Sequence, residues 1–559
     1  MIRVVSTNIT SPLGFTTEEN YLAVKSGKSS LAVREHPWGI PERVCASLFT
    51  DAQWKALSVE GMTGFESLAV RSIREALQRT DMDVSSPRVV LIISSTKGNI
   101  EIMADGGEYV SLAESARRIA SATGVTTSPV VVCNACISGA SAQLLALRLL
   151  EAGRYDKAVV CGADCVGKFV VSGFSSLKAL SQEPCRPFDI DRYGLNLGEA
   201  AATVIFSREE DGAGAAWALC GGSVRNDAYH ISSPSKTAEG CSRAIRAAME
   251  DGERPTLVSV HGTATLYNDQ MESVALCSTG MENVPAMALK GVYGHTLGAA
   301  GILETILSMC SADDGEALPS RGFSSLGVSG RISISGEAQP LRGSSFLKII
   351  SGFGGCNAAL RFSKNTEGNG ERKELPSVTT AHRVNITQDG VIVDGETLAM
   401  QQRGEAMLTE LYRSCVGDYP KFHKMDVLSK LAFISSELLL KAEGKTPQET
   451  EERAVILFNA SSSIVADKLF LSTIEDGNYY PSPSHFVYTL PNISTGEIAI
   501  RNGYHGETSF YILPEKSDRQ MDDITECAFA DGSVRSVICG WIDCPDAEHF
   551  ESELCIKMR

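Results

Sequence analysis

The chain has 559 residues, of which 43% are hydrophobic and 21% charged, and its formal net charge is −17 at pH 7. This length predicts two or three packed units rather than a single core. The acidic balance argues against nucleic acid as the main partner, because binding phosphates requires clustered Lys and Arg. The opening MIRVVSTNIT does not resemble a secretory signal, and no apolar run reaches the roughly twenty residues of a membrane span. We therefore expect a cytoplasmic protein without a membrane span.

The sixteen cysteines are scattered through apolar stretches such as AVVCGADC and SVICGWIDC. In a cytoplasmic protein such residues act as small buried hydrophobes rather than as disulfide partners. The cysteine pattern therefore leaves one thiol, considered below, as a candidate reactive group.

Short apolar segments alternate with segments of helical periodicity from the N-terminus onward. Buried strands are predicted at 89–95, 129–133 and 157–165, and amphipathic helices at 66–79 and 139–153. This alternation predicts a mostly parallel sheet with helices on both faces.

The chain divides at a polar segment. SKNTEGNGERKELPS is rich in Gly and charge and is typical of a linker. We predict a first domain at 1–363, a linker at 364–380 and a second domain at 381–559.

The second domain partly repeats the first. RVVLIISSTKGN (88–99) is echoed by RAVILFNASSSI (453–464), and KAVVCGADC (157–165) by RSVICGWIDC (535–544). Two similar pairs in the same order indicate a duplicated module, of which the second copy is only a front half.

The candidate nucleophile is Cys136 in PVVVCNACISGASAQ. It is predicted to open a helix after the strand that ends near Cys133. The positive end of a helix dipole stabilises a thiolate. An inert buried cysteine is an equal alternative on this evidence alone, and a CxxC zinc or redox site with Cys133 is a less favoured one, since no second CxxC is present.

Two histidines have similar surroundings. His261 follows an apolar strand in LVSVHGTATLYND, and His295 precedes a Gly/Ala-rich helix in KGVYGHTLGAAGILET. Lys290 lies upstream of His295, and Glu304 lies downstream. A single histidine is usually structural, but two at strand-to-loop ends flanked by Gly and Thr favour a shared site. The Gly-rich segment lacks the Lys-Ser/Thr of a nucleotide-binding loop.

Five motifs occur in the order seen in elongating β-ketoacyl-acyl-carrier-protein synthases, which the region 1–363 resembles. They are NACISGA, CRPFDIDRYGLNLGEAAA, HGTATLYND, GHTLGAAG and SGFGGCNAAL. The resemblance implies a thiolase-type five-layer αβαβα sandwich, followed here by a partial, degenerate copy of its N-terminal half. Two histidines favour the elongating type over thiolases and initiating synthases, whose sites differ.

The resemblance also implies a role for each matching residue. Cys136 would accept an acyl group, and the backbone N–H groups of Cys136 and Phe353 would form an oxyanion hole. His261 and His295 would donate hydrogen bonds to a malonyl thioester, and the Lys290–Glu304 ion pair would orient them. Other implied roles are a gate at Phe353, a phosphopantetheine tunnel at Thr263 and Thr265, and substrate contact at Phe174. The resemblance implies no metal and no cofactor. It implies substrates carried on the phosphopantetheine of an acyl-carrier protein.

The sequence departs from the family in two places. A PSxxFPxxLPN-like segment is missing before Cys136 and is present instead as PSPSHFVYTLPN (481–492) in the second domain. That domain has no cysteine where its nucleophile would follow and no HGT or GHT motif, so it is not expected to catalyse the reaction alone. Family members dock acidic carrier proteins on bases before the first long helix. Here VEGMTGFES (59–67) has none, so we hypothesise docking at Lys421 and Lys424 of KFHKMD, with an ordinary solvated loop as the alternative.

The sequence therefore predicts a 3-oxoacyl-acyl-carrier-protein synthase in fatty acid, aryl polyene or related polyketide synthesis. The main alternative is a non-catalytic scaffold, or chain-length-factor subunit, beside an active synthase. A further alternative is acyl transfer or thioester hydrolysis on Cys136. The resemblance implies a homodimer or a heterodimer with another synthase. Product class, chain length and carrier identity are not determined by the sequence.

Overall fold

Two sheets form the framework of the N-terminal region. The computed structural model describes residues 2–208, 216–250, 252–364, 372–444, 448–475 and 478–559. The strands of the first sheet pair in the order β5, β4, β6, β8, β1, with bounds Val130–Val132, Val89–Ser94, Lys157–Asp164, Ala200–Ser207 and Ile2–Thr10. Those of the second sheet pair in the order β11, β10, β14, β15, β9, with bounds Ala286–Met287, Leu257–Ser259, Ser345–Ser351, Cys356–Ser363 and Ala218–Asn226.

Helices pack in three layers around these two sheets. The outer helices on the first sheet are α3 (Gly64–Leu77) and α5 (Leu112–Thr123). Between the sheets lie α6 (Ser138–Glu151) and α11 (Ala300–Asp313), and outside the second sheet lie α8 (Glu239–Ala248) and α9 (Leu266–Ser278). All six residues of β4 are buried, as expected for a strand covered on both faces. The five predicted αβαβα layers are present.

A third sheet forms the C-terminal region. Its strands pair in the order β22, β19, β23, β24, β16, β17, β18, with bounds Thr508–Ile512, Arg453–Asn459, Ser536–Asp543, Glu551–Met558, Thr379–Thr387, Gly390–Val393 and Glu396–Leu398. One face is covered by α13 (Val427–Ala442) and α16 (Ile493–Asn502), with α12 (Gly404–Cys415) packed against α13, and the other carries α17 (Asp518–Ala528). Within the described residues the order β19–β23–β24–β16 matches β4–β6–β8–β1, but no second sheet or counterpart of α11 follows.

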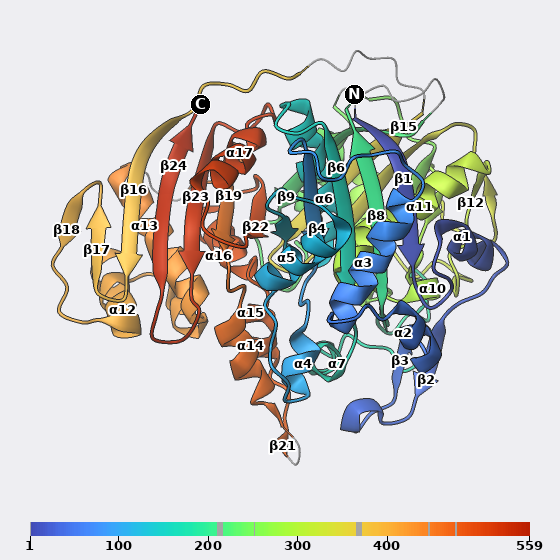
Figure 1. Ribbon diagram of the computed structural model, residues 1–559, viewed down its shortest axis with the longest axis horizontal. Helices are drawn as coiled ribbons and strands as arrows, with labels where there is room; N and C mark the ends of the chain where they lie inside the picture. Colours follow the sequence, from blue (N-terminus) through green and yellow to red (C-terminus); the bar gives the residue numbers. More distant parts are fainter. Residues whose placement is uncertain (1, 209–215, 251, 365–371, 445–447, 476–477) are drawn as a thin grey trace.

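The two regions share one continuous sheet. Strand β22 pairs antiparallel with β5, placing Tyr511 opposite Val132 and Ile512 opposite Val131. The N–H of Cys133 donates to the carbonyl of Phe510 at 3.0 Å. Figure 1 shows the red strands of the C-terminal region beside the blue and teal strands of the N-terminal one. The sheet edge beside the nucleophile is thus already paired within the chain.

Buried ion pairs also connect the regions. Lys97 meets Asp467 at 2.6 Å, and Arg148 meets Glu507 at 2.6 Å. Part of the predicted linker, 365–371, lies outside the described residues, while 372–378 is described and contains no helix or strand. None of the described helices has both the length and the apolar character needed to cross a bilayer.

Candidate active site

Cys136 lies at the junction between the first sheet and the central helix layer. The sequence predicted it as the first residue of the helix, but it belongs to a single 3₁₀ turn, Ala135–Ile137, that runs directly into α6. Ala135 has φ of +48°, a left-handed conformation that is strained for a residue with a Cβ. Strain of this kind is characteristic of turns that hold a reactive side chain in a fixed position.

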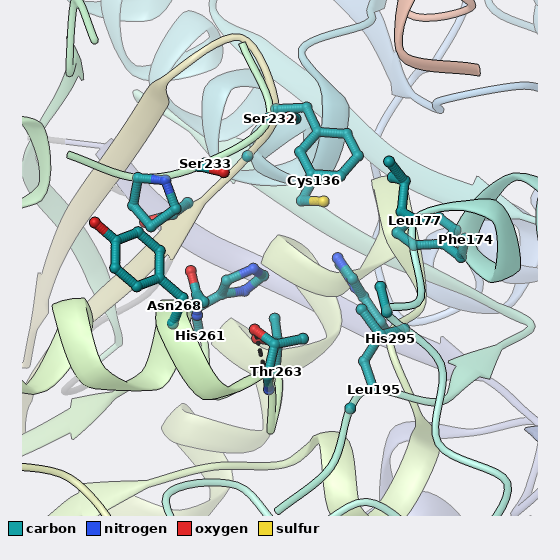
Figure 2. A pocket seen from close by; sticks show the side chains of 18 of the residues that line it. Cys136, Phe174, Leu177, Leu195, Ser232, Ser233, His261, Thr263, Asn268 and His295 are labelled. Carbon is teal, nitrogen blue, oxygen red and sulfur yellow. Dashed lines mark hydrogen bonds between the residues drawn. The ribbon is translucent and has the colours of Figure 1, made fainter. Parts of the chain in front are cut away.

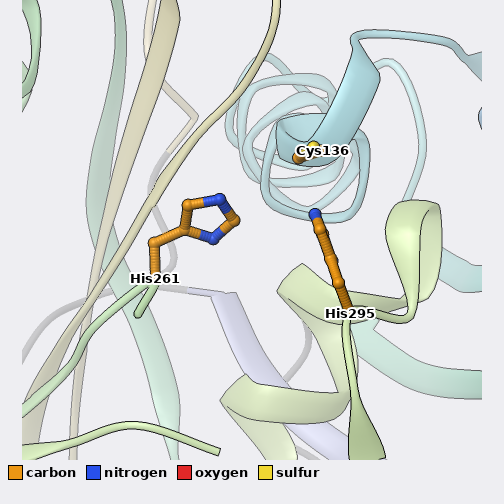
Figure 3. Close-up of side chains that lie close together, drawn as sticks. All are labelled: Cys136, His261 and His295. Carbon is orange, nitrogen blue, oxygen red and sulfur yellow. The ribbon is translucent and has the colours of Figure 1, made fainter. Parts of the chain in front are cut away.

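His261 and His295 converge on Cys136, as predicted. His261 follows β10, and His295 follows the short helix α10 (Lys290–Tyr293). Their ring centroids are 5.2 Å apart, and the rings are inclined at 81°. The Cys136 sulfur and one ring nitrogen from each histidine all lie within 4.8 Å of one another (Figure 3).

The tautomer of His295 follows from its backbone contact. The N–H of Leu297 donates to His295 Nδ1 at 3.2 Å, so Nδ1 accepts and the proton of the neutral ring is on Nε2. Within the part of the chain that the structure describes, His295 Nε2 and His261 Nδ1 are buried without a hydrogen-bond partner. Since buried polar atoms are normally paired, an unpaired N–H facing the Cys136 sulfur indicates a donor available to a ligand.

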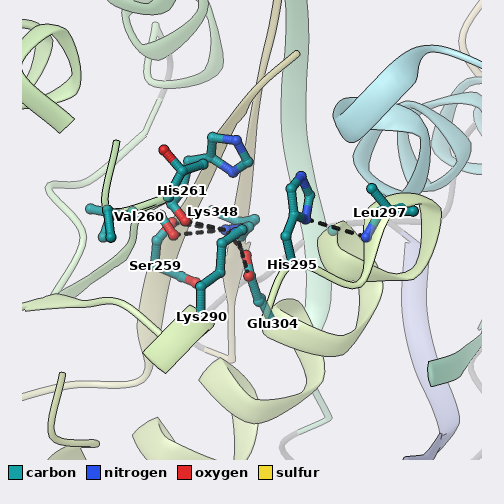
Figure 4. A network of polar contacts seen from close by, with 12 residues as sticks. Ser259, Val260, His261, Lys290, His295, Leu297, Glu304 and Lys348 are labelled. Carbon is teal, nitrogen blue, oxygen red and sulfur yellow. Dashed lines mark hydrogen bonds and ion pairs between the residues drawn. The ribbon is translucent and has the colours of Figure 1, made fainter. Parts of the chain in front are cut away.

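A buried charge cluster lies beneath the histidines (Figure 4). Lys290 Nζ contacts Glu304 Oε1 at 2.7 Å and donates to the carbonyl of His261 at 2.7 Å. This geometry agrees with the orienting role implied for the ion pair. A second lysine, which the sequence analysis missed, completes the cluster: Lys348 Nζ contacts Glu304 Oε2 at 2.5 Å. All three charged side chains are buried, so two positive charges face one negative charge.

These charges and the burial determine the protonation states of the site. Burial lowers the pKa of His261 and of His295 well below the ordinary value, and the positive charges of Lys290 and Lys348 lower both further. Both rings are therefore neutral at physiological pH. Burial raises the pKa of Cys136 to about 12, although Lys290 and a backbone N–H act in the opposite direction. The expected stabilisation of thiolate by the helix end is outweighed by desolvation, so the resting nucleophile is a thiol.

The three residues open into a pocket of about 420 Å³, a volume typical of small-molecule sites (Figure 2). The predicted residues that line it are Cys136, Phe174, His261, Thr263, Thr265, His295 and Phe353. The hydroxyls of Thr263 and Thr265 lie 2.9 Å apart on one wall. The spacing of the three reactive atoms would also suit a metal ion. The positive charges of the neighbouring Lys290 and Lys348 disfavour such a further cation.

Aromatic side chains close one end of the pocket. Phe174, on α7 (Lys168–Ser176), stacks on Phe353 with centroids 6.2 Å apart. Phe486, on α15 (Pro483–Tyr488) of the C-terminal region, packs edge-on against Phe174 at 5.4 Å. A Cβ added at Gly173 would lie 2.0 Å from the Phe486 ring, so only glycine allows this contact. Phe486 was not predicted as a site residue, although it lies within the PSPSHFVYTLPN motif.

The segment that carries Phe353 is held from both regions. Asn492, at the end of that same motif, donates to the carbonyl of Phe353 at 2.8 Å. Asn226 donates to the carbonyl of Gly354 at 2.8 Å, and the N–H of Gly354 donates to Ile231. The backbone that offers the predicted oxyanion N–H is therefore fixed partly by the C-terminal region.

A further missed residue supports the turn at His261. Glu272 on α9 accepts the N–H of Gly262 at 2.9 Å and also that of His261. In the sequence, the only sign of Glu272 is an acidic residue within a predicted helix. Such residues are common, so this pattern does not identify a site residue.

The lysines predicted to dock a carrier protein lie on a 3₁₀ turn, Pro420–Lys424. Burial lowers the pKa of His230, and the positive charge of Lys421 lowers it further. His230 immediately precedes the segment containing Ser232 and Ser233, which line the pocket. Lys424 ends the same turn as Lys421.

Comparison with known proteins places this site in context. Residues 54–212 match the family described as Beta-ketoacyl synthase, N-terminal domain, and residues 218–324 match Beta-ketoacyl synthase, C-terminal domain. The 3-oxoacyl-[acyl-carrier-protein] synthase 2 of Staphylococcus aureus (strain COL) is 32% identical over 248 residues, 41% of this chain. The corresponding protein of Synechocystis sp. (strain ATCC 27184 / PCC 6803 / Kazusa) is 31% identical over 250 residues. Each match spans 60% of the relative's length.

Solved structures extend the comparison beyond the N-terminal region. A beta-ketoacyl synthase from Burkholderia phymatum STM815 is 25% identical, with a TM-score of 0.58 over 65% of this chain and 98% of its own. The PfaC keto synthase-chain length factor has a TM-score of 0.79, 14% identity, and covers 100% of this chain and 78% of its own. The latter shares the fold over the whole chain.

The layered fold agrees with the thiolase-like fold of the solved beta-ketoacyl synthase. Residues 54–212 and 218–324 are thus similar to the two domains of the β-ketoacyl synthase family.

Proposed function

We propose that this protein is a 3-oxoacyl-acyl-carrier-protein synthase, a condensing acyltransferase with Cys136 as its nucleophile. The observation that carries the proposal is the convergence of the Cys136 thiol on two neutral, buried imidazoles with unpaired ring nitrogens. The similarity of 54–212 and 218–324 to the two β-ketoacyl synthase domains supports the same reaction.

The first half-reaction is transthioesterification. Cys136 attacks the acyl thioester of a carrier protein, and the N–H groups of Cys136 and Phe353 bind the oxyanion. The carrier thiolate leaves and takes up the proton that Cys136 loses. Removing one such donor typically costs about 10²–10³ in rate.

The second half-reaction needs donors rather than a base. A malonyl thioester binds with its carbonyl oxygen at His261 and His295. Loss of carbon dioxide leaves the electron pair on the enolate, which the imidazole N–H groups stabilise. The enolate carbon attacks the acyl group on Cys136, forming the 3-oxoacyl thioester and releasing a thiolate that regains a proton from water. No metal or redox cofactor takes part in this scheme.

We further propose that 381–559 is a degenerate half-synthase that acts as the partner of 1–363 within one chain. The pairing of β22 with β5 supports this, because it occupies the edge beside the nucleophile. The whole-chain likeness to a keto synthase-chain length factor supports it as well. A homodimer or heterodimer, if one forms, would then use another surface. Phe486 would limit the depth of the acyl pocket.

Lys421 and Lys424 are proposed to attract an acidic acyl-carrier protein to the pocket entrance. The effect of the Lys421 charge on the pKa of His230 supports this position, since His230 lies two residues before the pocket-lining Ser232. A cytoplasmic location stays a prediction from the sequence, as do fatty acid, aryl polyene and polyketide products.

The test is intact-mass spectrometry after incubation with acyl-carrier-protein and acyl-CoA donors, followed by a malonyl decarboxylation assay. We expect an acyl adduct on the native protein, none on Cys136→Ala, and release of carbon dioxide. A chain without adduct or decarboxylation would instead be the non-catalytic scaffold. An adduct without decarboxylation would indicate acyl transfer or hydrolysis.

A further inference from the structure

The face of the C-terminal sheet that carries α17 also carries a pair of adjacent thiols. Cys539 on β23 and Cys555 on β24 are direct antiparallel partners, and their sulfur atoms are 3.7 Å apart. Cys539 is buried, whereas Cys555 is partly exposed. Directly opposed residues of antiparallel strands have the spacing that a disulfide requires without movement of the backbone.

Packing alone does not require cysteine at these positions. In the C-terminal sheet, Ser536 of β23 pairs with Arg453 of β19 and with Met558 of β24. The equivalent position in the first sheet is Lys157 of β6, which pairs with Val89 of β4 and with Ser207 of β8. Counting three residues along each strand, the pair Cys539 and Cys555 corresponds to Val160 and Val204. That valine pair is buried in the core formed with α6 and α11.

Among the described residues no counterpart of α11 covers this part of the sheet, and Cys555 is partly exposed. A groove of about 450 Å³ lies there, lined by both cysteines together with Arg383, Trp541 and Lys557. Near the cysteines, the strand β24 carries Glu553 and Lys557 where β8 carries the apolar Ala202 and Phe206. The face is therefore adapted to solvent.

The two sulfurs differ in reactivity. Either thiol can donate to the other. This contact, together with the positive charges of Lys557 and Arg383, lowers the pKa of Cys555. Burial and the neighbouring sulfur raise the pKa of Cys539. The partly exposed sulfur is thus the better nucleophile, since the thiolate is the attacking form.

We propose that Cys539 and Cys555 form a thiol–disulfide exchange site that is oxidised by low-molecular-weight disulfides entering this groove. The Cys555 thiolate attacks one sulfur of the oxidant, forming a mixed disulfide and releasing one thiolate. Cys539 then loses its proton to solvent and attacks the Cys555 sulfur, which releases the second thiolate. The cysteine pair loses two electrons and two protons, and the oxidant becomes two thiols. This site is independent of the proposed condensation.

The experiment is titration of the native full-length protein with oxidised glutathione, followed by alkylation and peptide mapping. We expect a linked peptide containing Cys539 and Cys555, reversed by reduced glutathione. Cys539→Ser should stop at a glutathione adduct on Cys555, and Cys555→Ser should give neither product. Cys415→Ser, which removes another partly exposed thiol of the same region, should leave the link unchanged.

Melting of the oxidised protein gives a second readout. The cross-link should raise the melting midpoint, roughly by a few degrees, because it restricts the unfolded chain. The double variant Cys539→Val/Cys555→Val, which reproduces the valine pair, should fold and show no response to oxidant. The proposal is overturned if Cys539 and Cys555 stay reduced while the exposed Cys277 is modified, or if Cys555 is modified without forming the link.

Discussion

At the scale of single residues, a buried cluster of charges lies beneath the site. Lys290 and Lys348 share one carboxylate, Glu304, beneath two imidazoles. Burial, reinforced by the positive charges of the two lysines, keeps His261 and His295 neutral. A protonated imidazole would pair with the malonyl carboxylate and hold it in place, so neutral donors suit decarboxylation. Lys348 is therefore expected to act as a positioning and electrostatic residue rather than a catalytic one.

Lys348→Met tests this role. Removing one positive charge should raise the pKa of both histidines. The imidazoles of the variant then become protonated at a higher pH, and decarboxylation is lost at that higher pH. We expect the acid limb of the pH–rate profile to move up by about one unit. The surface pair Lys364–Asp313 offers the control Lys364→Met, which should leave the profile in place. An unshifted acid limb in Lys348→Met would contradict the argument.

The histidines can be separated from the nucleophile. His295→Ala removes an N–H aimed at Cys136, so the malonyl enolate loses a donor. We predict a fall of about 10²–10³ in decarboxylation, measured as carbon dioxide release. Acylation of Cys136, followed by intact mass, should persist. Loss of acylation together with decarboxylation would indicate that His295 acts on the thiol instead.

At the scale of elements, α15 packs against α7, which carries the pocket-lining residue Phe174. Phe486 reaches from the C-terminal region onto Gly173 and Phe174. The contact is possible because a glycine occurs where the ring needs space. A helix of one region therefore packs behind Phe174, which lines the pocket in the other.

Phe486→Leu should enlarge this end of the pocket. We expect acyl donors with longer chains to modify Cys136 faster, while short donors react as before. The readout is the rate of adduct formation, by intact mass, across donors of increasing length. Phe458→Leu is the matched control, because this buried residue stacks on Tyr511 away from the pocket. An identical chain-length range in both variants would refute the role of Phe486.

At the scale of the whole molecule, the two regions behave as one folding unit. The β5–β22 pairing joins their sheets, and the buried Arg148–Glu507 pair lies at the same junction. A unit held by a shared sheet and a shared core should unfold in a single transition. The C-terminal region is then expected to be required for the stability of the N-terminal one.

Glu507→Gln should expose this coupling. It leaves Arg148 buried beside a neutral partner, and breaking a buried pair costs about 3–5 kcal/mol. We expect one urea transition, moved to lower denaturant, with hydrogen-exchange protection reduced in β5 as well as in β22. The half-exposed pair Lys516–Glu553 provides the control Glu553→Gln, for which little change is expected. Two separate transitions would show that the regions fold independently.

Much of the catalytic site could be predicted from the sequence. Cys136, His261 and His295 each occur in a short motif of Gly, Thr and small residues, because their turns need close backbone packing. The predicted strands and helices also agree with β4, β5, β6, α3 and α6 to within about two residues. Local sequence is sufficient here, since a strand buried on both faces and an amphipathic helix have distinct patterns of apolar residues.

Only the tertiary structure decided which distant residues complete the site and how the chain pairs with itself. Lys348 lies in an ordinary apolar strand pattern, and its role depends on the fold placing it beside Glu304. Phe486 belongs to a segment over 300 residues from Cys136 along the sequence. The pairing of β22 with β5 involves backbone groups that carry no residue-specific signal. The sequence by itself determined the reactive groups and the layered fold, because these follow from local patterns. The tertiary structure determined the buried charge cluster, the packing of Phe486 behind the pocket and the pairing of the two regions. These features depend on contacts between segments far apart in the chain.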